Sequence, residues 1–178
     1  MVRTSAFLLL GAAALAACAA DAPDPTEPDD LTVPVFDRGG VPGHVATQFR
    51  AAGLKGRNEI PANESRGAGA AVFSLDASGT SLHYRLIVAN IDDVTQSHIH
   101  LGQPDENGPI VAFLFGFEAS GVTVNGVLAE GTIEANDLVG PLAGEPLSVL
   151  VEAIRAGSTY TNVHTIELPP GEIRAQIH

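Results

Sequence analysis

Short apolar runs separated by turn residues fill the chain from about residue 44 to its end, and this spacing constrains the fold more than any other feature. In one run Leu82, Tyr84, Leu86 and Val88 alternate with other residues, which places the four side chains on one face of a strand. We expect strands at residues 45–54, 68–75, 82–89, 97–101, 110–115, 160–165 and 172–177, and either a bent strand or a hairpin over 122–133.

One segment, residues 147–156, has helical rather than strand spacing. Its apolar residues stand at 147, 150, 151 and 154, and the segment begins after Pro146 and ends at Gly157. About eight short strands and one short helix predict an all-β fold. The architecture that fits is a single antiparallel Greek-key β-sandwich or barrel with one short helix.

The N-terminus is similar to the signal peptide of a bacterial lipoprotein. Arg3 supplies a positive charge, residues 6–14 are apolar apart from Gly11, and the tetrad Leu-Ala-Ala-Cys resembles a lipobox ending at Cys18. The apolar run is shorter than the roughly 20 residues that span a membrane. We therefore expect residues 1–17 to be a signal peptide and Cys18 to be lipidated. The alternative is an ordinary signal peptide with a chance cysteine.

Residues 18–43 are predicted to form a lipidated tether that carries the folded domain, residues 44–178. The tether is rich in proline and acidic residues, which favour an extended, solvated chain. The whole chain has a formal charge of −12, and removing residues 1–17 takes away one basic and no acidic residue. Such acidity excludes nucleic acid as a partner and leaves the acyl groups to hold the protein at a bilayer. We expect a lipid-anchored envelope protein, in the outer membrane and facing the periplasm or the cell surface.

Four spaced motifs resemble the CHRD domain, a family named for chordin. They are LKGRNEIP at 54–61, SHIHLG with NGPIV at 97–111, YTNVHT at 160–165 and PGEIRAQI at 170–177. Thr161 replaces the family's usual Val, and Ala175 its usual Gly. The resemblance implies an immunoglobulin-like β-sandwich. It does not imply a mechanism, because the bacterial members of the family have no settled activity and chordin's growth-factor ligands do not carry over to a bacterium.

Three histidines are the candidate metal ligands: His98, His100 and His164. Residues i and i+2 of a strand point the same way, about 6.6 Å apart, so His98 and His100 can converge on one ion. His164 on a neighbouring strand would make three protein ligands, and imidazole suits copper or zinc. The alternative is a structural hydrogen-bond network, since imidazole both donates and accepts.

Acidic side chains near these motifs could orient the imidazole rings, and Asp105, Glu106 and Glu172 are the candidates. By the period of two, Glu172 and Arg174 lie on one face of the last strand, where they can form a polar network or an acid–base pair. The three histidines also resemble copper ligands of the copper-zinc superoxide dismutases, a second and weaker similarity. However, the chain lacks that family's zinc loop and bridging histidine.

These features favour a non-catalytic, extracytoplasmic binding module with a protein or small-molecule partner and no certain cofactor. The alternative is a copper- or zinc-binding protein with redox or dismutase-like activity through the three histidines. A purely structural envelope protein ranks third.

Overall fold

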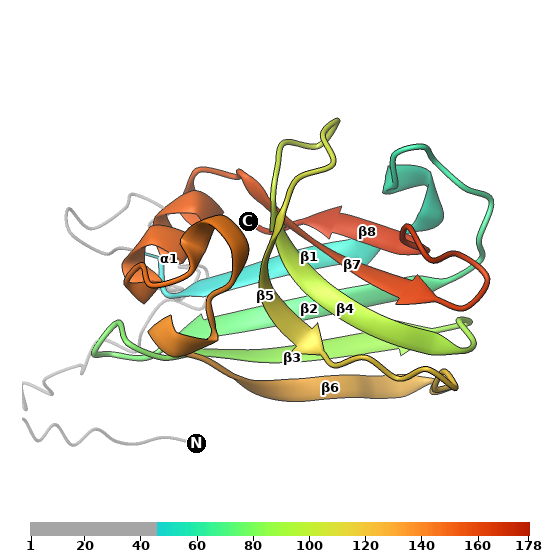
Figure 1. Ribbon diagram of the computed structural model, residues 1–178, viewed down its shortest axis with the longest axis horizontal. Helices are drawn as coiled ribbons and strands as arrows, with labels where there is room; N and C mark the ends of the chain where they lie inside the picture. Colours follow the sequence, from blue (N-terminus) through green and yellow to red (C-terminus); the bar gives the residue numbers. More distant parts are fainter. Residues whose placement is uncertain (1–45) are drawn as a thin grey trace, which may run out of the picture. The chain divides into compact units, whose positions relative to one another are not determined.

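The structure, a computed structural model, describes residues 46–178, and eight strands form two antiparallel sheets in this part of the chain (Figure 1). The predicted signal peptide, Cys18 and the tether lie outside the described residues. The first sheet has the order β1-β2-β3-β6, with β1 (Gln48–Leu54), β2 (Ala68–Leu75), β3 (Leu82–Ala89) and β6 (Gly126–Ile133). The second has the order β5-β4-β7-β8, with β4 (Val94–Leu101), β5 (Ile110–Phe115), β7 (Thr159–Thr165) and β8 (Ile173–Gln176).

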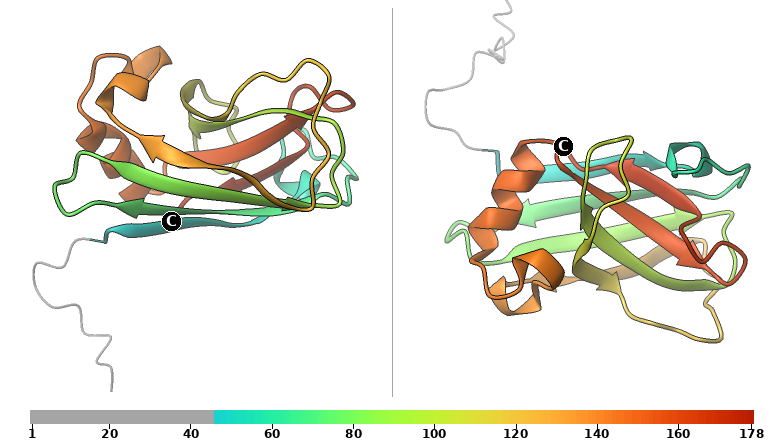
Figure 2. Two further views of the ribbon diagram at one scale, coloured as in Figure 1. Left: turned by 90° about the horizontal axis from the view of Figure 1, so that it is seen from below. Right: turned by 45° about the horizontal axis from the view of Figure 1, so that its top comes forward.

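The two sheets pack face to face, which confirms the predicted all-β sandwich (Figure 2). Alternation along β3 buries Leu82, Leu86 and Val88 against the opposite sheet, whose inner face contributes Ile99 and Val163. At one side the sheets are also joined by backbone hydrogen bonds between β1 and the C-terminal segment. The Arg50 amide donates to the His178 carbonyl, and the Lys55 amide donates to the Arg174 carbonyl.

The helix α1 (Leu147–Arg155) lies at one end of the sandwich (Figure 1). Pro146 precedes its first turn, and its four apolar residues at helical spacing are buried in the core, as predicted. The chain leaves the helix through Gly157, whose φ of +69° suits glycine. Three short 3-10 helices complete the described elements: η1 (Gly56–Asn58), η2 (Ala135–Asp137) and η3 (Gly140–Leu142). None of the helices in residues 46–178 is long and apolar enough to cross a bilayer.

The segment 122–133 differs from both alternatives that its glycines suggested. Only its second part is a regular strand, β6, which pairs with β3. Val122 instead forms an isolated bridge with Val94 of the other sheet, and the two residues exchange both backbone hydrogen bonds. The segment therefore crosses from one sheet to the other, a long-range pairing that local periodicity does not contain.

The outer face of the second sheet is polar and yet buried. Because side chains alternate along β4 and β7, Ile99 and Val163 face the core while His98, His100 and His164 face the other way. The β4–β5 loop (residues 102–109) and the β7–β8 loop (residues 166–172) each contact a histidine of this outer face. The fold thus holds a second, polar interior outside the main core.

Candidate functional site

Three histidines from two adjacent strands meet on this outer face. His98 and His100 come from β4, and His164 comes from β7. One ring nitrogen of each lies within 4.8 Å of the others, and all three side chains are buried. Nδ1 of His98 and Nε2 of His164 are 3.1 Å apart, which is a hydrogen-bond distance. The structure therefore brings together the three residues that the sequence predicted as metal ligands.

Backbone carbonyl groups fix the orientation and the tautomer of two of the rings. Nδ1 of His100 donates to the Gly108 carbonyl at 2.9 Å, and Nδ1 of His164 donates to the Pro169 carbonyl at 2.8 Å. A carbonyl oxygen can only accept, so in each neutral ring Nδ1 carries the proton and Nε2 has a free lone pair. Carbonyl contacts of this kind are typical around metal-binding histidines.

The contact with His164 fixes which nitrogen of the His98 ring carries the proton. Because Nε2 of His164 is an acceptor, Nδ1 of His98 must donate across the 3.1 Å contact, which leaves Nε2 of His98 unprotonated. Nε2 of His98, Nε2 of His100 and Oδ1 of the neighbouring Asn162 are all buried without a hydrogen-bond partner in the described part of the chain. Unpaired buried polar atoms are rare in folded proteins and call for an explanation.

Burial keeps the three rings neutral. Burial lowers the pKa of His98 to about 3, with further lowering from His164 and His100. Burial is also the main cause of the lowered pKa values of His100 and His164, and it outweighs the carbonyl contacts, which act in the opposite direction. A neutral imidazole is the form that ligates a metal ion.

Aromatic rings border the histidines on two sides. The Tyr160 ring stacks on His100, with centroids 4.7 Å apart and planes at 7°. The Phe113 ring meets His98 edge-on at 4.8 Å, and Phe113 itself is half exposed. The Gly108 amide donates to the Tyr160 hydroxyl, so the backbone of one residue positions both His100 and its stacking partner.

The acidic residues that the sequence suggested as ring-orienting groups do not fill that role. The partners of the His100 and His164 rings are carbonyl oxygens. Asp105 and Glu106 are exposed on the β4–β5 loop, and Glu172 accepts hydrogen bonds from Ser65 and Thr165. The prediction was wrong because it rested on nearness in the sequence motif, and a pattern of residue types does not show which backbone carbonyls contact the rings.

Glu172 and Arg174 also do not form the acid–base pair that their spacing suggested. Strand β8 begins only at Ile173, and Glu172 belongs to the preceding loop. The Arg174 guanidinium turns to the β4–β5 loop, where it donates to the carbonyls of Gln103 and Glu106 and to the Asn107 side chain. Each residue joins its own polar network, and Arg174 clamps the loop that carries the carbonyl partner of His100.

The comparison with protein families covers this whole arrangement, since the CHRD domain model matches residues 50–177. The chain belongs to the CHRD domain family. The match confirms the resemblance of the spaced motifs and includes all three clustered histidines. No curated protein and no solved structure matches the chain.

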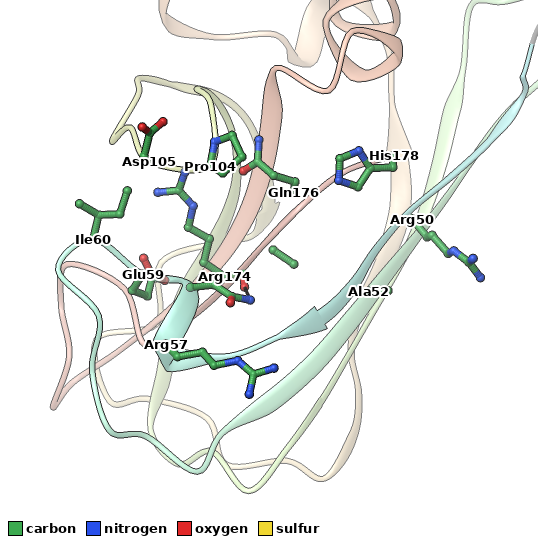
Figure 3. A pocket seen from close by; sticks show the side chains of 12 residues that line it. Arg50, Ala52, Arg57, Glu59, Ile60, Pro104, Asp105, Arg174, Gln176 and His178 are labelled. Carbon is green, nitrogen blue, oxygen red and sulfur yellow. Dashed lines mark hydrogen bonds between the residues drawn. The ribbon is translucent and has the colours of Figure 1, made fainter.

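A pocket of about 830 Å³ lies on this CHRD domain where β1, β8 and the β4–β5 loop meet (Figure 3). Arg50 and Arg57 on its wall are exposed and make no ion pair, because the one ion pair in residues 46–178 joins Arg85 and Glu130. Glu59 is buried beside the pocket, and burial raises its pKa to about 7, although the positive charge of Arg174 acts against the rise. The full lining is Arg50, Ala52, Arg57, Asn58, Glu59, Ile60, Pro104, Asp105, Arg174, Ala175, Gln176 and His178.

Sequence reasoning missed several residues of the CHRD histidine cluster. Asn162 and Tyr160 share a face of β7 with His164, so the period of two could have identified both. Gly108 was missed as well. A Cβ there would lie 1.4 Å from the Leu101 carbonyl oxygen, and the Gly108 carbonyl accepts from Nδ1 of His100. Outside the cluster lie His83, which contacts Thr132, and His178.

Proposed function

We propose that this CHRD protein binds a transition-metal ion, zinc or copper, through His98, His100 and His164. The observation that carries the proposal is the convergence of three buried, neutral imidazoles, two of them fixed by carbonyl groups so that Nε2 is unprotonated. A structural network would use its lone pairs internally, whereas here buried nitrogen lone pairs remain without a donor. Imidazole nitrogen suits both ions. The proposal assigns binding and not turnover.

We test it on the full chain, purified in detergent. The protein is stripped with a chelator, incubated with zinc or copper, dialysed and analysed for metal by mass spectrometry. We expect close to one ion per chain for the wild type and a loss of most of it in the His98→Gln and His164→Gln variants. The matched control is His83→Gln, which removes an exposed histidine on the other sheet. Equal metal retention in all variants, or none in the wild type, contradicts the proposal.

We also propose that the protein is a lipoprotein anchored in the cell envelope through Cys18, with residues 1–17 removed and 18–43 acting as a tether. The lipobox-like tetrad and the acidic, proline-rich segment support this. A Cys18→Ser variant should fail to incorporate labelled palmitate and should lose membrane association, whereas Ser5→Ala should do neither. Labelling of Cys18→Ser at the wild-type level would refute the anchor.

The arginine-lined pocket supports a second candidate function, the binding of a small organic anion. Its wall carries two exposed arginines, Arg50 and Arg57, that form no ion pair within residues 46–178 and can meet an anion, although the chain has a formal charge of −12. The pocket volume is in the range of small-molecule sites, roughly 300–1,000 Å³. Calorimetric titration with citrate should show binding that the Arg50→Gln/Arg57→Gln variant loses and the Arg85→Gln control keeps. If titration of the wild type with citrate releases or absorbs no heat of binding, citrate-like tricarboxylates are rejected as ligands.

A further inference from the structure

Asn162 lies on the polar face on which the three histidines meet. It is paired in register with His98 of β4, and it lies two residues before His164 on β7, so the three side chains share one face. Asn162 is 3% exposed. A carboxamide at such a position needs partners for its oxygen, because burial of an unpaired polar group is costly.

The oxygen of Asn162 has no such partner among the described residues. The neighbouring ring nitrogens that remain free, Nε2 of His98 and Nε2 of His100, are acceptors in their neutral forms and cannot donate to it. The Asn162 carboxamide lies beside the His100 ring. Three buried lone pairs on this face therefore have no donor among the described residues.

A cation satisfies all three lone pairs at once, whereas a single water molecule has only two hydrogens to donate. We propose that Oδ1 of Asn162 is the fourth donor of the metal site, which then presents three imidazole nitrogens and one amide oxygen. This inference rests on the proposed metal-binding function and extends it to the coordination set. All four donors are neutral, and four protein donors leave no position for substrate, as in structural tetrahedral zinc sites. Zinc is then the preferred ion.

The test uses cobalt(II), whose visible absorption reports coordination, as a probe in place of zinc. The metal-free full chain in detergent is titrated with cobalt(II) and, separately, with zinc in competition with a chelator. The variants are Asn162→Ala, which removes the donor, and Asn162→Asp, which keeps its shape and adds a charge. Asn63→Ala is the matched control, because Asn63 is another partly buried structural asparagine that donates to the Gly171 and Glu172 carbonyls, outside the cluster.

We expect an intense tetrahedral cobalt spectrum for the wild type and for Asn63→Ala. Asn162→Ala should bind zinc about 10–100-fold more weakly and shift the cobalt bands, and Asn162→Asp should bind at least as tightly as the wild type with its own shifted spectrum. If Asn162→Ala loses affinity but keeps the wild-type spectrum, Asn162 acts only by positioning a ring and the inference is wrong. Unchanged affinity and spectrum in both variants also overturn it.

The titrations distinguish failure of the fourth-donor inference from failure of the metal-binding proposal. A wild-type chain that takes up neither zinc nor cobalt contradicts metal binding as a whole. A wild type that binds through the three histidines, with Asn162 variants that bind identically, leaves the three-histidine site intact and removes only the fourth donor. Should Asn162→Ala fail to fold, the spectrum of Asn162→Asp decides alone, because a carboxylate donor must shift the bands if position 162 coordinates the ion.

Discussion

The guanidinium carbon of Arg174 lies 3.4 Å from the centroid of the Tyr160 ring. Strands β4 and β8 flank β7 on opposite sides, so the other face of Tyr160 is the one that stacks on His100. A cation, a phenol ring and an imidazole thus form a three-layer stack across the sheet. The outermost layer also holds the β4–β5 loop through three hydrogen bonds. Arg174 is therefore the residue through which the loop, the aromatic layer and the histidine cluster are joined.

The Arg174→Met variant should unfold more readily, by about 2–4 kcal/mol, because it leaves two loop carbonyls and the Asn107 oxygen without their donor. Arg174→Lys keeps the charge but cannot reproduce the planar fork, so it should recover only part of the loss. Urea unfolding followed by circular dichroism measures both. Arg85→Gln, which breaks an exposed ion pair, should change stability by less than about 1 kcal/mol. If Arg174→Met were as mild as this control, the clamp would have no energetic role.

Acid should destabilise the metal-free protein through the buried histidines. The pKa of His98 is about 3 in the fold against an ordinary 6.5, so the unfolded chain binds the proton first as pH falls. The stability from this group is complete above pH 6.5 and is lost between pH 6.5 and about 3, by roughly 1.4 kcal/mol per pH unit. His98→Gln should therefore show a shallower decline of unfolding free energy from pH 7 to 4 than the wild type. Equal slopes would mean that His98 is charged in the fold.

The fold was predictable because its elements follow local periodicity. Strands β2, β3 and β5 begin and end at the predicted residues, and α1 ends one residue earlier than its pattern suggested. The alternation that identifies these strands arises from burial of one face, which the sequence records directly. The crossing of segment 122–133 between sheets was not predictable, since the Val122–Val94 bridge joins residues whose pairing no local pattern specifies.

The candidate site was predictable only in part. The i, i+2 spacing of His98 and His100 gives their common face, and the family motifs added His164. The groups that orient the rings are the carbonyls of Gly108 and Pro169, and a carbonyl has no sequence signature. The partners of Arg174 escaped prediction for the same reason: two are backbone atoms in a loop more than 60 residues away. The spacing of side chains along a strand predicts which of them share a face of the sheet. The contacts that loop carbonyls make with those side chains depend on how the loops fold.

Glu59 should make stability depend on pH in the opposite direction to the histidines. Its pKa is raised from 4.5 to about 7 in the fold, chiefly by burial, so the folded chain keeps a proton that the unfolded chain has released. The stability from protonated Glu59 is present below pH 4.5 and is lost as pH rises through 7, about 3 kcal/mol in all. The wild type should therefore lose unfolding free energy from pH 5 to pH 8, and the Glu59→Gln variant should not. The difference in unfolding free energy between the variant and the wild type should grow in favour of the variant over this range. Glu118 is exposed, so for Glu118→Gln the difference in unfolding free energy from the wild type should not change over this pH range. An equal change in both variants would mean that burial of Glu59 is not its cause.

Gly108→Ala should damage the histidine cluster without touching a histidine. A Cβ at this position would lie 1.4 Å from the Leu101 carbonyl oxygen, so the loop must move, and the Gly108 carbonyl would then leave Nδ1 of His100. We expect a loss of about 2 kcal/mol or more in unfolding free energy and a zinc affinity at least about 10-fold lower, since ring-orienting contacts commonly account for that much. Gly116→Ala is the matched control, because no atom lies within 4 Å of its added Cβ. Urea unfolding and chelator competition measure the two effects. A destabilised Gly108→Ala that still binds zinc at wild-type affinity would show that the carbonyl supports the loop and not the ring, and the proposed site would then have to tolerate a freely rotating His100.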